Sequence, residues 1–507
     1  MGKAIMLQGT ASDVGKSVLT AALCRILSQD GYRVAPFKAQ NMALNSGVTA
    51  DGCEIGRAQL VQAEAAQTPA TVDMNPILLK PISDTDCQVV VMGKAIGNFN
   101  ALDYIELKKR LSTVTEEGLK RLMAAHDIVV IEGAGSPAEV NLRDHDIVNM
   151  PVARWAKAPV VLVADIDRGG LFAYVHGTLK LLLPWERDLV CGIIVNKFRG
   201  DRTRFAEGEA MLSQITGQPV LGVVPFDPTL DIPEEDAVPG EHFLAPGELD
   251  DLVIGVVYLP HISNFTDFDA LRREPGVVVR YLKPNSSWDC DLLILPGSKN
   301  TIDDLIALRR WGIDARIADL RRRKVPIFGI CGGYQMLGTE IVDASGVEST
   351  QPSTTGLGLL PMNTAFAQEK QVQRTKGRIT TDTHRGLFAD CGGLDVAGYE
   401  IHMGRSSGGE CSPLVCLENG SFDGAVTEDG LVAGTYLHGF FDEPELRRAC
   451  LRNVRAMVGR SASTHVPFQV DGIDPFDTWA DHVRSSLDIH QIYRILGIPS
   501  FSSREPR

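Results

Sequence analysis

Two series of alternating apolar strands and amphipathic helices constrain the fold of this chain most strongly. Helical stretches such as Val18–Gln29 and Asp103–Ala125 separate the apolar runs of the first half. Because such alternation is typical of strands joined by helical crossovers, it predicts a mostly parallel sheet with helices on both faces. The predicted strands of this first series are Ala4–Gln8, Arg33–Phe37, Ile128–Ile131, Val160–Ala164, Cys191–Val195 and Val220–Val224.

A second series of the same kind follows in the other half of the chain. Helices are predicted around Thr301–Arg310 and Asp314–Arg323. The stretch 356–438 is rich in Gly and Thr, and we expect shorter mixed strands and loops there. The whole chain is therefore predicted to contain two α/β domains. The predicted strands of the second series are Leu252–Tyr258, Val277–Leu282, Leu292–Leu295 and Val325–Phe328.

The two series are separated by a segment of different composition. Residues 230–251 are rich in Asp, Glu, Pro and Gly, which is typical of a solvated linker. These signals divide the chain into a first domain at 1–232, a linker at 233–250, a second domain at 251–448 and a helical tail at 449–507. One amphipathic helix is predicted in the tail, near Trp479–Leu496.

Composition excludes several classes of protein. The net charge of −14 argues against a nucleic-acid or anionic-membrane partner, and an anionic substrate must then be met by a local basic patch. No apolar run approaches the length of a membrane helix, and the N-terminus enters a strand without a signal peptide. The ten cysteines form no CxxC pair, so they indicate a reduced, cytoplasmic protein without a permanently bound metal or cofactor.

A phosphate-binding loop follows the first predicted strand. The sequence from Gly9 to Ser17 lies between this strand and a helix, which is the context that the motif requires. Backbone N–H groups around Gly15 are expected to cradle phosphates, and Lys16 to neutralise their oxygens. The first glycine lies one residue upstream of the usual spacing, and Thr10 takes its place. The segment predicts a nucleotide site rather than an ordinary turn.

Two further strand ends carry polar groups that suit such a site. Glu132 ends a strand and precedes Gly133, and with the Ser17 hydroxyl it is the expected ligand of Mg²⁺. Asn196 follows a later strand and is a candidate for nucleotide binding. The alternative for Glu132 is a solvent-facing carboxylate at a strand end. The alternative for Asn196 is a position in a plain loop.

The segment Phe37–Ser46 is dense in amide side chains. Lys38 is the candidate within it to stabilise charge on a transferred phosphoryl group. Glu54, Arg57 and Gln59 follow on a predicted helix. A weak surface pair between Glu54 and Arg57 is the alternative to a functional role.

A small-residue turn around Cys331 joins a predicted strand to a predicted helix in the second domain. Such a turn exposes the intervening side chain at the end of a parallel sheet, as in a nucleophile elbow with Cys in place of Ser. Gly332 and the loop carrying Gly297 are the expected sources of oxyanion-binding N–H groups.

The thiol needs a base, and His438 is the candidate. It follows a short strand among small residues, from which an imidazole can approach a neighbouring strand end. His402 and His384 compete with it, and spacing alone does not select among the 11 histidines.

Taken together, these motifs resemble those of the cobyric acid synthase family, glutamine-dependent amidases of cobalamin biosynthesis, over nearly the whole chain. The first half is similar to dethiobiotin synthetase-like P-loop ATPases, and the second to class I glutamine amidotransferases. The resemblance implies that Cys331 is the nucleophile and His438 the base. A Glu two residues after the His usually completes the class I triad, but Phe440 stands there, so a Cys–His dyad without an assigned orienting group is expected. The motifs that carry the resemblance are Gly9–Ser17, Lys38–Met42, Glu132–Gly135, Pro296–Thr301, Cys331, Tyr399–Gly404 and His438.

The resemblance implies a carbon–nitrogen ligase that uses ATP-Mg²⁺ and glutamine. Its substrate would be adenosylcobyrinic acid a,c-diamide, amidated at the b, d, e and g carboxylates through acyl phosphates. Cobyrinic acid a,c-diamide synthase is the nearest alternative, although the run Lys38–Ser46 resembles the b,d,e,g enzyme more closely. From another class, a partitioning-type ATPase switch is the second alternative, and glutaminase activity separates it from the other two.

Overall fold

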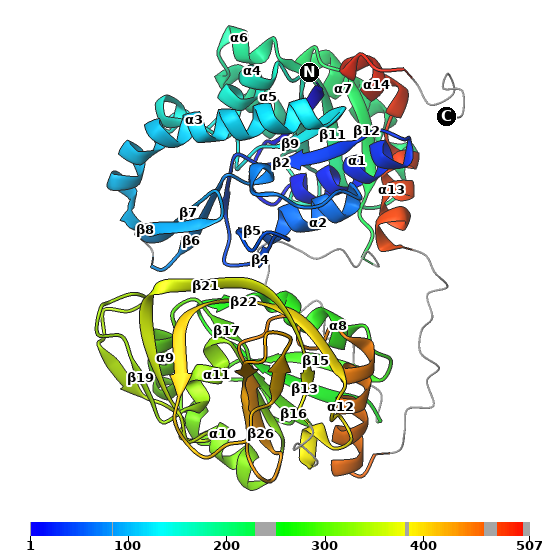
Figure 1. The fold of residues 1–507 in the computed structure, drawn as a ribbon. Coiled ribbons are helices and arrows are strands. Elements are labelled where there is room, and N and C mark those ends of the chain that lie inside the picture. The colour runs from blue at the N-terminus through cyan, green and yellow to red at the C-terminus, as the bar shows by residue number, and fades with distance from the viewer. Residues whose placement is uncertain (1, 84, 229–249, 381–384, 461–473, 500–507) are drawn as a thin grey trace. The chain divides into compact units, whose positions relative to one another are not determined.

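The computed structural model describes residues 2–83, 85–228, 250–380, 385–460 and 474–499 (Figure 1). Contacts between Cα atoms divide the chain into two compact units. The first comprises Met1–Ala43, Glu54–Glu235 and Asp471–Arg507, and the second comprises Leu44–Cys53 and Asp236–Val470. The predicted linker 233–250 lies, apart from residue 250, outside the described residues.

The first unit is built on a six-stranded sheet in the order β12-β11-β10-β1-β9-β2, and all of its strands are parallel. Nearly every residue of the central strands is buried, because helices cover both faces of the sheet. The six strands predicted for the first half are confirmed, with bounds that differ by three residues at most. The strands are β1 Lys3–Gly9, β2 Val34–Phe37, β9 Ile128–Glu132, β10 Val160–Asp165, β11 Val190–Phe198 and β12 Val220–Pro225.

Two groups of helices cover this sheet (Figure 1). One apolar core forms under α1, α13 and α14, and a second forms on the other face under α3, α4, α5 and α7. The short helix α2 packs against α1. The bounds are α1 Lys16–Gln29, α2 Arg57–Ala65, α3 Ala101–Ala125, α4 Met150–Ala156, α5 Leu171–Leu181, α6 Pro184–Arg187, α7 Ala206–Thr216, α13 Pro475–Ser486 and α14 Ile489–Leu496.

The C-terminal helices α13 and α14 correct the prediction of one helix over Trp479–Leu496. The helix is interrupted at Leu487, whose backbone is extended and forms a bridge with Gly222 of β12. Asp488 is the N-cap of α14, and its side chain accepts a hydrogen bond from the N–H of Gln491. The hydrophobic periodicity continues through the break, so it did not reveal the break.

Polar contacts hold α13 to α1. The Arg25 guanidinium, which is 5% exposed, pairs with Asp474 at 2.5 Å and with Asp477 at 2.6 Å. The indole N–H of Trp479 donates to the backbone oxygen of Val18 at 2.8 Å. The helix that follows the phosphate loop is therefore packed against the C-terminal segment of the chain.

A second, four-stranded sheet of the first unit has the order β3-β6-β7-β8. No strand of this sheet was expected from the sequence. Its strands are β3 Gln40–Met42, β6 Ile77–Pro81, β7 Asp86–Val91 and β8 Lys94–Asn100, and the short strand β5 Glu54–Gly56 leads into α2.

The second unit contains another six-stranded sheet, in the order β15-β13-β16-β18-β26-β25. Its strands are parallel except for β25, which pairs antiparallel with β26. The four strands predicted here are confirmed, although β18 ends two residues later than expected. The bounds are β13 Leu252–Val257, β15 Val277–Leu282, β16 Leu292–Leu295, β18 Ile327–Ile330, β25 Ala425–Val426 and β26 Val432–Thr435, with helices α8 Asp269–Arg272, α9 Thr301–Arg310, α10 Ile313–Arg322, α11 Gly332–Leu337 and α12 Pro444–Met457.

A long hairpin replaces the short strands expected over 356–438. Strands β21 (Asn363–Ile379) and β22 (Asp395–Ser407) pair antiparallel along most of their length. Much of β21 is exposed and polar, so its sequence lacks the apolar run of a buried strand. The same sheet contains β19 Glu340–Val342, β20 Ser353–Thr355, β23 Val415–Leu417 and β24 Phe422–Asp423.

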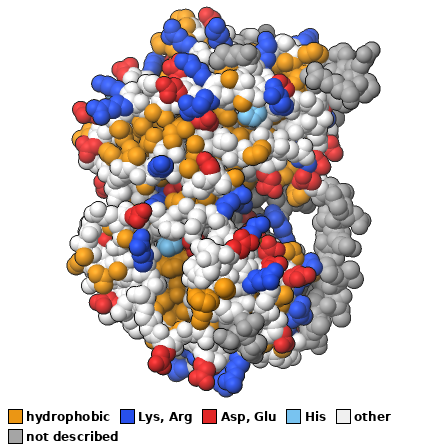
Figure 2. All heavy atoms as spheres, in the orientation of Figure 1, with side chains coloured by type: hydrophobic (Ala, Val, Ile, Leu, Met, Phe, Trp, Pro, Cys, Tyr) orange, Lys and Arg blue, Asp and Glu red, His pale blue; other side chains and the backbone are white. Residues whose placement is uncertain are grey.

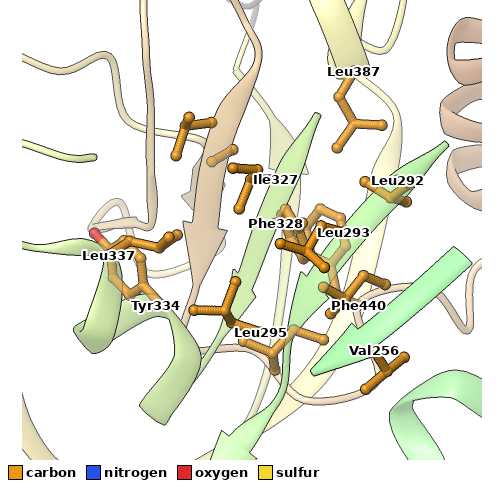
Figure 3. Close-up of a cluster of buried hydrophobic side chains, with 14 of the residues drawn as sticks. Val256, Leu292, Leu293, Leu295, Ile327, Phe328, Tyr334, Leu337, Leu387 and Phe440 are labelled. Atoms are coloured by element: carbon orange, nitrogen blue, oxygen red, sulfur yellow. The ribbon is translucent and has the colours of Figure 1, made fainter. Parts of the chain in front are cut away.

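The core of the second unit is centred on β18 (Figure 3). The ring of Phe328 lies 4.9 Å from that of Phe440 and 5.3 Å from that of Phe441. Phe440, at the position where a triad Glu was considered, is fully buried in this aromatic cluster. Its side chain therefore fills the core beneath the elbow.

Acidic and basic side chains are interspersed on the face drawn in Figure 2, without a large basic patch. Among the described residues, no helix has both the length and the apolarity needed to cross a membrane.

Candidate active site

Cys331 lies at the turn between β18 and α11. Its φ of 50° and ψ of −107° are a strained combination for a residue with a side chain, as expected at a nucleophile elbow. The Cys331 N–H donates to the oxygen of Thr435 at 2.8 Å. A methyl group on Gly329 would lie 2.7 Å from backbone atoms of Tyr334, so the tight turn requires glycine there. The sequence therefore folds locally so that one thiol projects from the end of the sheet.

His438 lies beside this thiol. Its Nδ1 donates to Oδ2 of Asp267 at 2.8 Å, and both side chains are almost completely buried. Although burial opposes the charged form, Asp267 and a hydrogen bond with Cys331 raise the pKa of His438 to about 10. The ring also stacks on Tyr399, with centroids 5.3 Å apart. The arrangement can hold a thiolate next to an imidazolium.

The competing histidines differ from His438 in their surroundings. His402 lies on β22, where its Nδ1 donates to the oxygen of Gly404 at 2.8 Å and its ring stacks on Tyr436 at 3.9 Å. Burial lowers the pKa of His402 to about 4, so it stays neutral. His384 lies outside the described residues.

Asp267 is the functional residue that sequence reasoning missed. It lies in the single turn Phe265–Phe268 and fixes the orientation of His438. Its other oxygen accepts the N–H of Gly439 at 2.9 Å. Asp267 lies between Thr266 and Phe268 in a stretch of mixed polarity, and its sequence neighbours gave no signal of this role. The dyad expected from the sequence thus gains a third member.

Gly297 and Gly332 both lie next to the elbow. A methyl group on Gly297 would lie 3.0 Å from Cε1 of His438, and one on Gly332 would lie 2.8 Å from the nitrogen of Ser298. Both glycines therefore let the short strand β17 (Gly297–Ser298) and the start of α11 approach each other closely. The structure brings Gly297, Gly332, Cys331 and His438 together in the second unit.

A buried network supports the strand β17, which carries Gly297. Ser298 donates to Oδ2 of Asp304 at 2.6 Å, and His261 Nδ1 donates to Oδ1 at 2.7 Å. Asp304 is fully buried, and its two partners occupy both carboxylate oxygens. Sequence reasoning did not identify this network, which joins three separate segments.

The predicted phosphate loop of the first unit lies between β1 and α1. Gly15 adopts a left-handed φ of 92°, and a side chain there would collide with the amide of Asn196. Lys16 Nζ donates to the oxygens of Ala11 at 3.0 Å and Gly135 at 3.2 Å. Thr10 continues β1, with its N–H bonded to Val163 at 2.9 Å. Lys16 thus lies across the concave side of the loop.

Asn196 supports this loop from β11. Its Nδ2 donates to the oxygen of Val14 at 2.9 Å, and the residue is buried. The contact fixes the loop backbone just before Gly15.

Glu132 is the centre of a buried polar cluster beside the loop. Its Oε1 accepts from Ser17 Oγ at 2.7 Å and lies 3.0 Å from Lys38 Nζ. Gln62 of α2 donates to the other oxygen at 2.6 Å. Burial acts to raise the pKa of Glu132, but Lys38 and the hydrogen bonds outweigh it and lower the pKa. The carboxylate is therefore ionised at neutral pH.

The alternative interpretation of Glu54 and Arg57 as a weak surface pair is wrong. Glu54 is buried and pairs with Lys80 at 2.8 Å. Gln62, which sequence reasoning missed, is a better marker of the site because it contacts Glu132. All seven predicted residues of the nucleotide site lie around the phosphate loop: Thr10, Gly15, Lys16, Ser17, Lys38, Glu132 and Asn196.

Two family models match this chain, and each covers one of the two halves. Residues 5–239 match the CobQ/CobB/MinD/ParA nucleotide binding domain, and residues 253–446 match the CobB/CobQ-like glutamine amidotransferase domain. The structure of PurLQS from Thermotoga maritima is 18% identical, with a TM-score of 0.32, and the match covers 41% of this chain and 99% of that one.

Similarity to curated proteins extends over the full length. The cobyric acid synthases of Salmonella heidelberg (strain SL476) and Salmonella typhimurium (strain LT2) are each 50% identical over 503 residues, which covers 98% of this chain and 99% of theirs. This match favours a cobyric acid synthase over the two alternatives, a cobyrinic acid a,c-diamide synthase and a partitioning-type ATPase switch. The chain belongs to the cobyric acid synthase family.

Proposed function

We propose that this enzyme amidates the b, d, e and g carboxylates of adenosylcobyrinic acid a,c-diamide, using glutamine as the nitrogen donor and ATP-Mg²⁺ to activate each carboxylate. The observation that carries the proposal is the presence, in one chain, of a Cys–His–Asp relay and a phosphate loop. A carboxylate is a poor electrophile at neutral pH, so an amidating enzyme needs both an ammonia source and an activating site.

Glutamine hydrolysis is assigned to the second unit. The Cys331 thiolate attacks the carboxamide carbon, and the N–H groups near Gly297 and Gly332 stabilise the oxyanion. His438, held by Asp267, gives a proton to the leaving nitrogen, so ammonia departs and a thioester remains. Water then attacks the thioester and gives a proton to His438, glutamate leaves, and the thiolate and the imidazolium are both restored.

Carboxylate activation is assigned to the first unit. A carboxylate oxygen of the corrinoid attacks the γ-phosphorus of ATP, ADP leaves, and an acyl phosphate forms. Ammonia then attacks the acyl carbon, phosphate leaves, and the nitrogen loses a proton as the amide forms. Lys16 and Lys38 are placed to stabilise the charge on the transferred phosphoryl group.

The residues around the loop suit a magnesium nucleotide. The Ser17 hydroxyl and the Glu132 carboxylate are oxygen ligands of the kind that Mg²⁺ prefers, and the two oxygens lie 2.7 Å apart. When bound, the ion would neutralise charge on the β- and γ-phosphates. Asn196 and Gly15 contribute by fixing the loop backbone.

The decisive experiment uses the purified full-length chain with glutamine, ATP and Mg²⁺. Incubation with the a,c-diamide should yield corrinoids that carry one to four new amides, resolved by ion exchange and mass spectrometry. A matched reaction with cobyrinic acid tests the rival diamide synthase. Amidation of cobyrinic acid alone would contradict the proposal, and glutamine hydrolysis with no amidation of either corrinoid would also do so.

A further inference from the structure

The start of α2 holds polar groups that the proposed chemistry has not used. Nε of Arg57 and Nε2 of Gln59 are buried, and neither has a hydrogen-bond partner among the described residues. Gln59 is fully buried, so its amide cannot be solvated at the surface. A buried donor without a partner costs free energy, which makes both groups candidates for ligand binding.

The helix terminus itself adds to these donors. The N-cap of α2 is Gly56, and no side chain caps the first turn. The first N–H groups of a helix lack intrahelical partners, and they carry a partial positive charge that favours anions. This first turn contains no acidic residue. The terminus and the two side chains therefore place several hydrogen-bond donors within one helical turn.

Neighbouring amides fix this arrangement. Asn41 Nδ2 donates to Oε1 of Gln59 at 3.2 Å, so the amide nitrogen of Gln59 remains available. Asn75 accepts the N–H of Gly56 at 3.2 Å and donates to the oxygen of Lys38 at 3.1 Å. The donors are thus built onto the same backbone segment as Lys38.

The site is also tied to the phosphate loop. Gln62, one turn beyond Gln59 on the same face of α2, donates to Glu132 at 2.6 Å and to the oxygen of Ser17 at 3.3 Å. An anion held at the start of α2 would therefore lie about one helical turn from the Glu132 cluster.

Arg57 differs in its partners from three arginines of this unit that form ion pairs. Arg25, Arg33 and Arg121 each pair with an aspartate. Arg57 has no acidic partner among the described residues. In a chain of net charge −14, an arginine without an acid beside a nucleotide site is suited to an external anion.

We propose that Arg57, Gln59 and the N-terminus of α2 form a binding site for a side-chain carboxylate of the substrate, next to the phosphoryl-transfer centre. This inference rests on the proposed function. The phosphate groups of ATP are held by the separate loop 9–17. The α2 site therefore binds the corrinoid, which accepts the phosphoryl group, and not the nucleotide.

The test compares Arg57→Ala, Arg57→Lys and Gln59→Glu with the unchanged enzyme. Arg110→Ala is the matched control, because it removes one positive charge from an exposed position on α3. The KM for the a,c-diamide should rise about tenfold or more in Arg57→Ala and Gln59→Glu, as expected for a lost hydrogen bond to a charged group. Arg57→Lys should recover part of the loss, and the KM for ATP and the glutaminase rate should stay near those of the parent.

Equilibrium dialysis gives a readout that does not depend on turnover. Arg57→Ala should bind the a,c-diamide about tenfold more weakly, but should bind the fully amidated product like the parent enzyme. An unchanged affinity for the a,c-diamide would show that these donors hold only water, and an equal loss for both corrinoids would indicate a packing role. A parent enzyme that fails to amidate the a,c-diamide would instead refute the proposed function.

Discussion

Nδ1 of His438 lies 2.8 Å from Oδ2 of Asp267, a residue 171 positions earlier in the chain. The contact fixes which ring nitrogen faces Cys331, and it does so without the Glu that usually follows the histidine by two positions. Asp267 therefore takes the orienting role from a different element of the same unit.

Replacement of Asp267 by Asn should keep the shape of the relay and remove its charge. We expect the glutaminase rate to fall by about 10²- to 10⁴-fold, because the imidazolium loses its buried counter-charge. Amidation with free ammonium should continue, and steady-state assays with each nitrogen source measure both effects. Unchanged glutamine hydrolysis would show that Asp267 has no part in orienting the base.

The same variant should alter the pH dependence of stability. The pKa of His438 is raised from 6.5 to about 10 in the folded protein, so its contribution is complete below pH 6.5 and is lost as the pH rises toward 10. The difference in unfolding free energy between the parent and Asp267→Asn should therefore be largest near pH 6 and shrink toward pH 10. Denaturant titrations across this range check the trend, and a gap that widens with pH would contradict it.

Cys331→Ser should abolish amidation that depends on glutamine and leave amidation by concentrated ammonium intact. The thiol serves only ammonia release, and the phosphate loop belongs to the other unit. Product formation with each nitrogen source is the measurement, and circular dichroism controls for folding. Loss of both activities in a folded variant would show that the two chemistries are not separable.

Lys16→Ala should remove amidation with either nitrogen source, because the transition state of acyl phosphate formation loses charge stabilisation. The rate of this step should fall by about 10³-fold or more. The glutaminase rate should persist within a few fold. A phosphate-release assay with the corrinoid present measures the first effect. Near-normal amidation would mean that the loop 9–17 is only a structural turn.

Gly297→Ala should slow glutamine hydrolysis. The added methyl group would lie 3.0 Å from Cε1 of His438, closer than a relaxed contact, so the imidazole or the loop must shift. A displacement of this kind lowers the rate by about 10- to 100-fold. The rate constant for glutamine hydrolysis tests this, with Gly135→Ala as a control for the loss of a glycine from the other unit. A parent-like rate would place His438 farther from the loop than described.

The parts of the fold that sequence predicted share one physical property. Buried parallel strands such as β1 and β10 are continuous apolar runs, so their positions were recognisable from sequence alone. The order of strands in each sheet depends on long-range pairing and was not predictable. The exposed hairpin strand β21 carries too few apolar residues to stand out, and the break at Leu487 interrupts a helix without interrupting its periodicity.

The residues of the candidate sites also fall into two groups, those that sequence could predict and those that it could not. Cys331 and Lys16 occupy turns whose backbone needs small neighbours, and that need is visible as local glycine patterns. Asp267 and Gln62 act through contacts with residues far away in the chain, and nothing in their immediate neighbours marks them. Local geometry could be inferred from sequence, whereas partners across the fold required the structure.

The path of the chain has a consequence for biosynthesis. The chain crosses between the two units four times, at 43–44, 53–54, 235–236 and 470–471, and α13 packs on α1 only after the last crossing. During translation, the helix behind the phosphate loop must wait for more than four hundred further residues before its partners Asp474 and Trp479 leave the ribosome. The nucleotide-binding unit therefore completes its core last, although its first strand is made first.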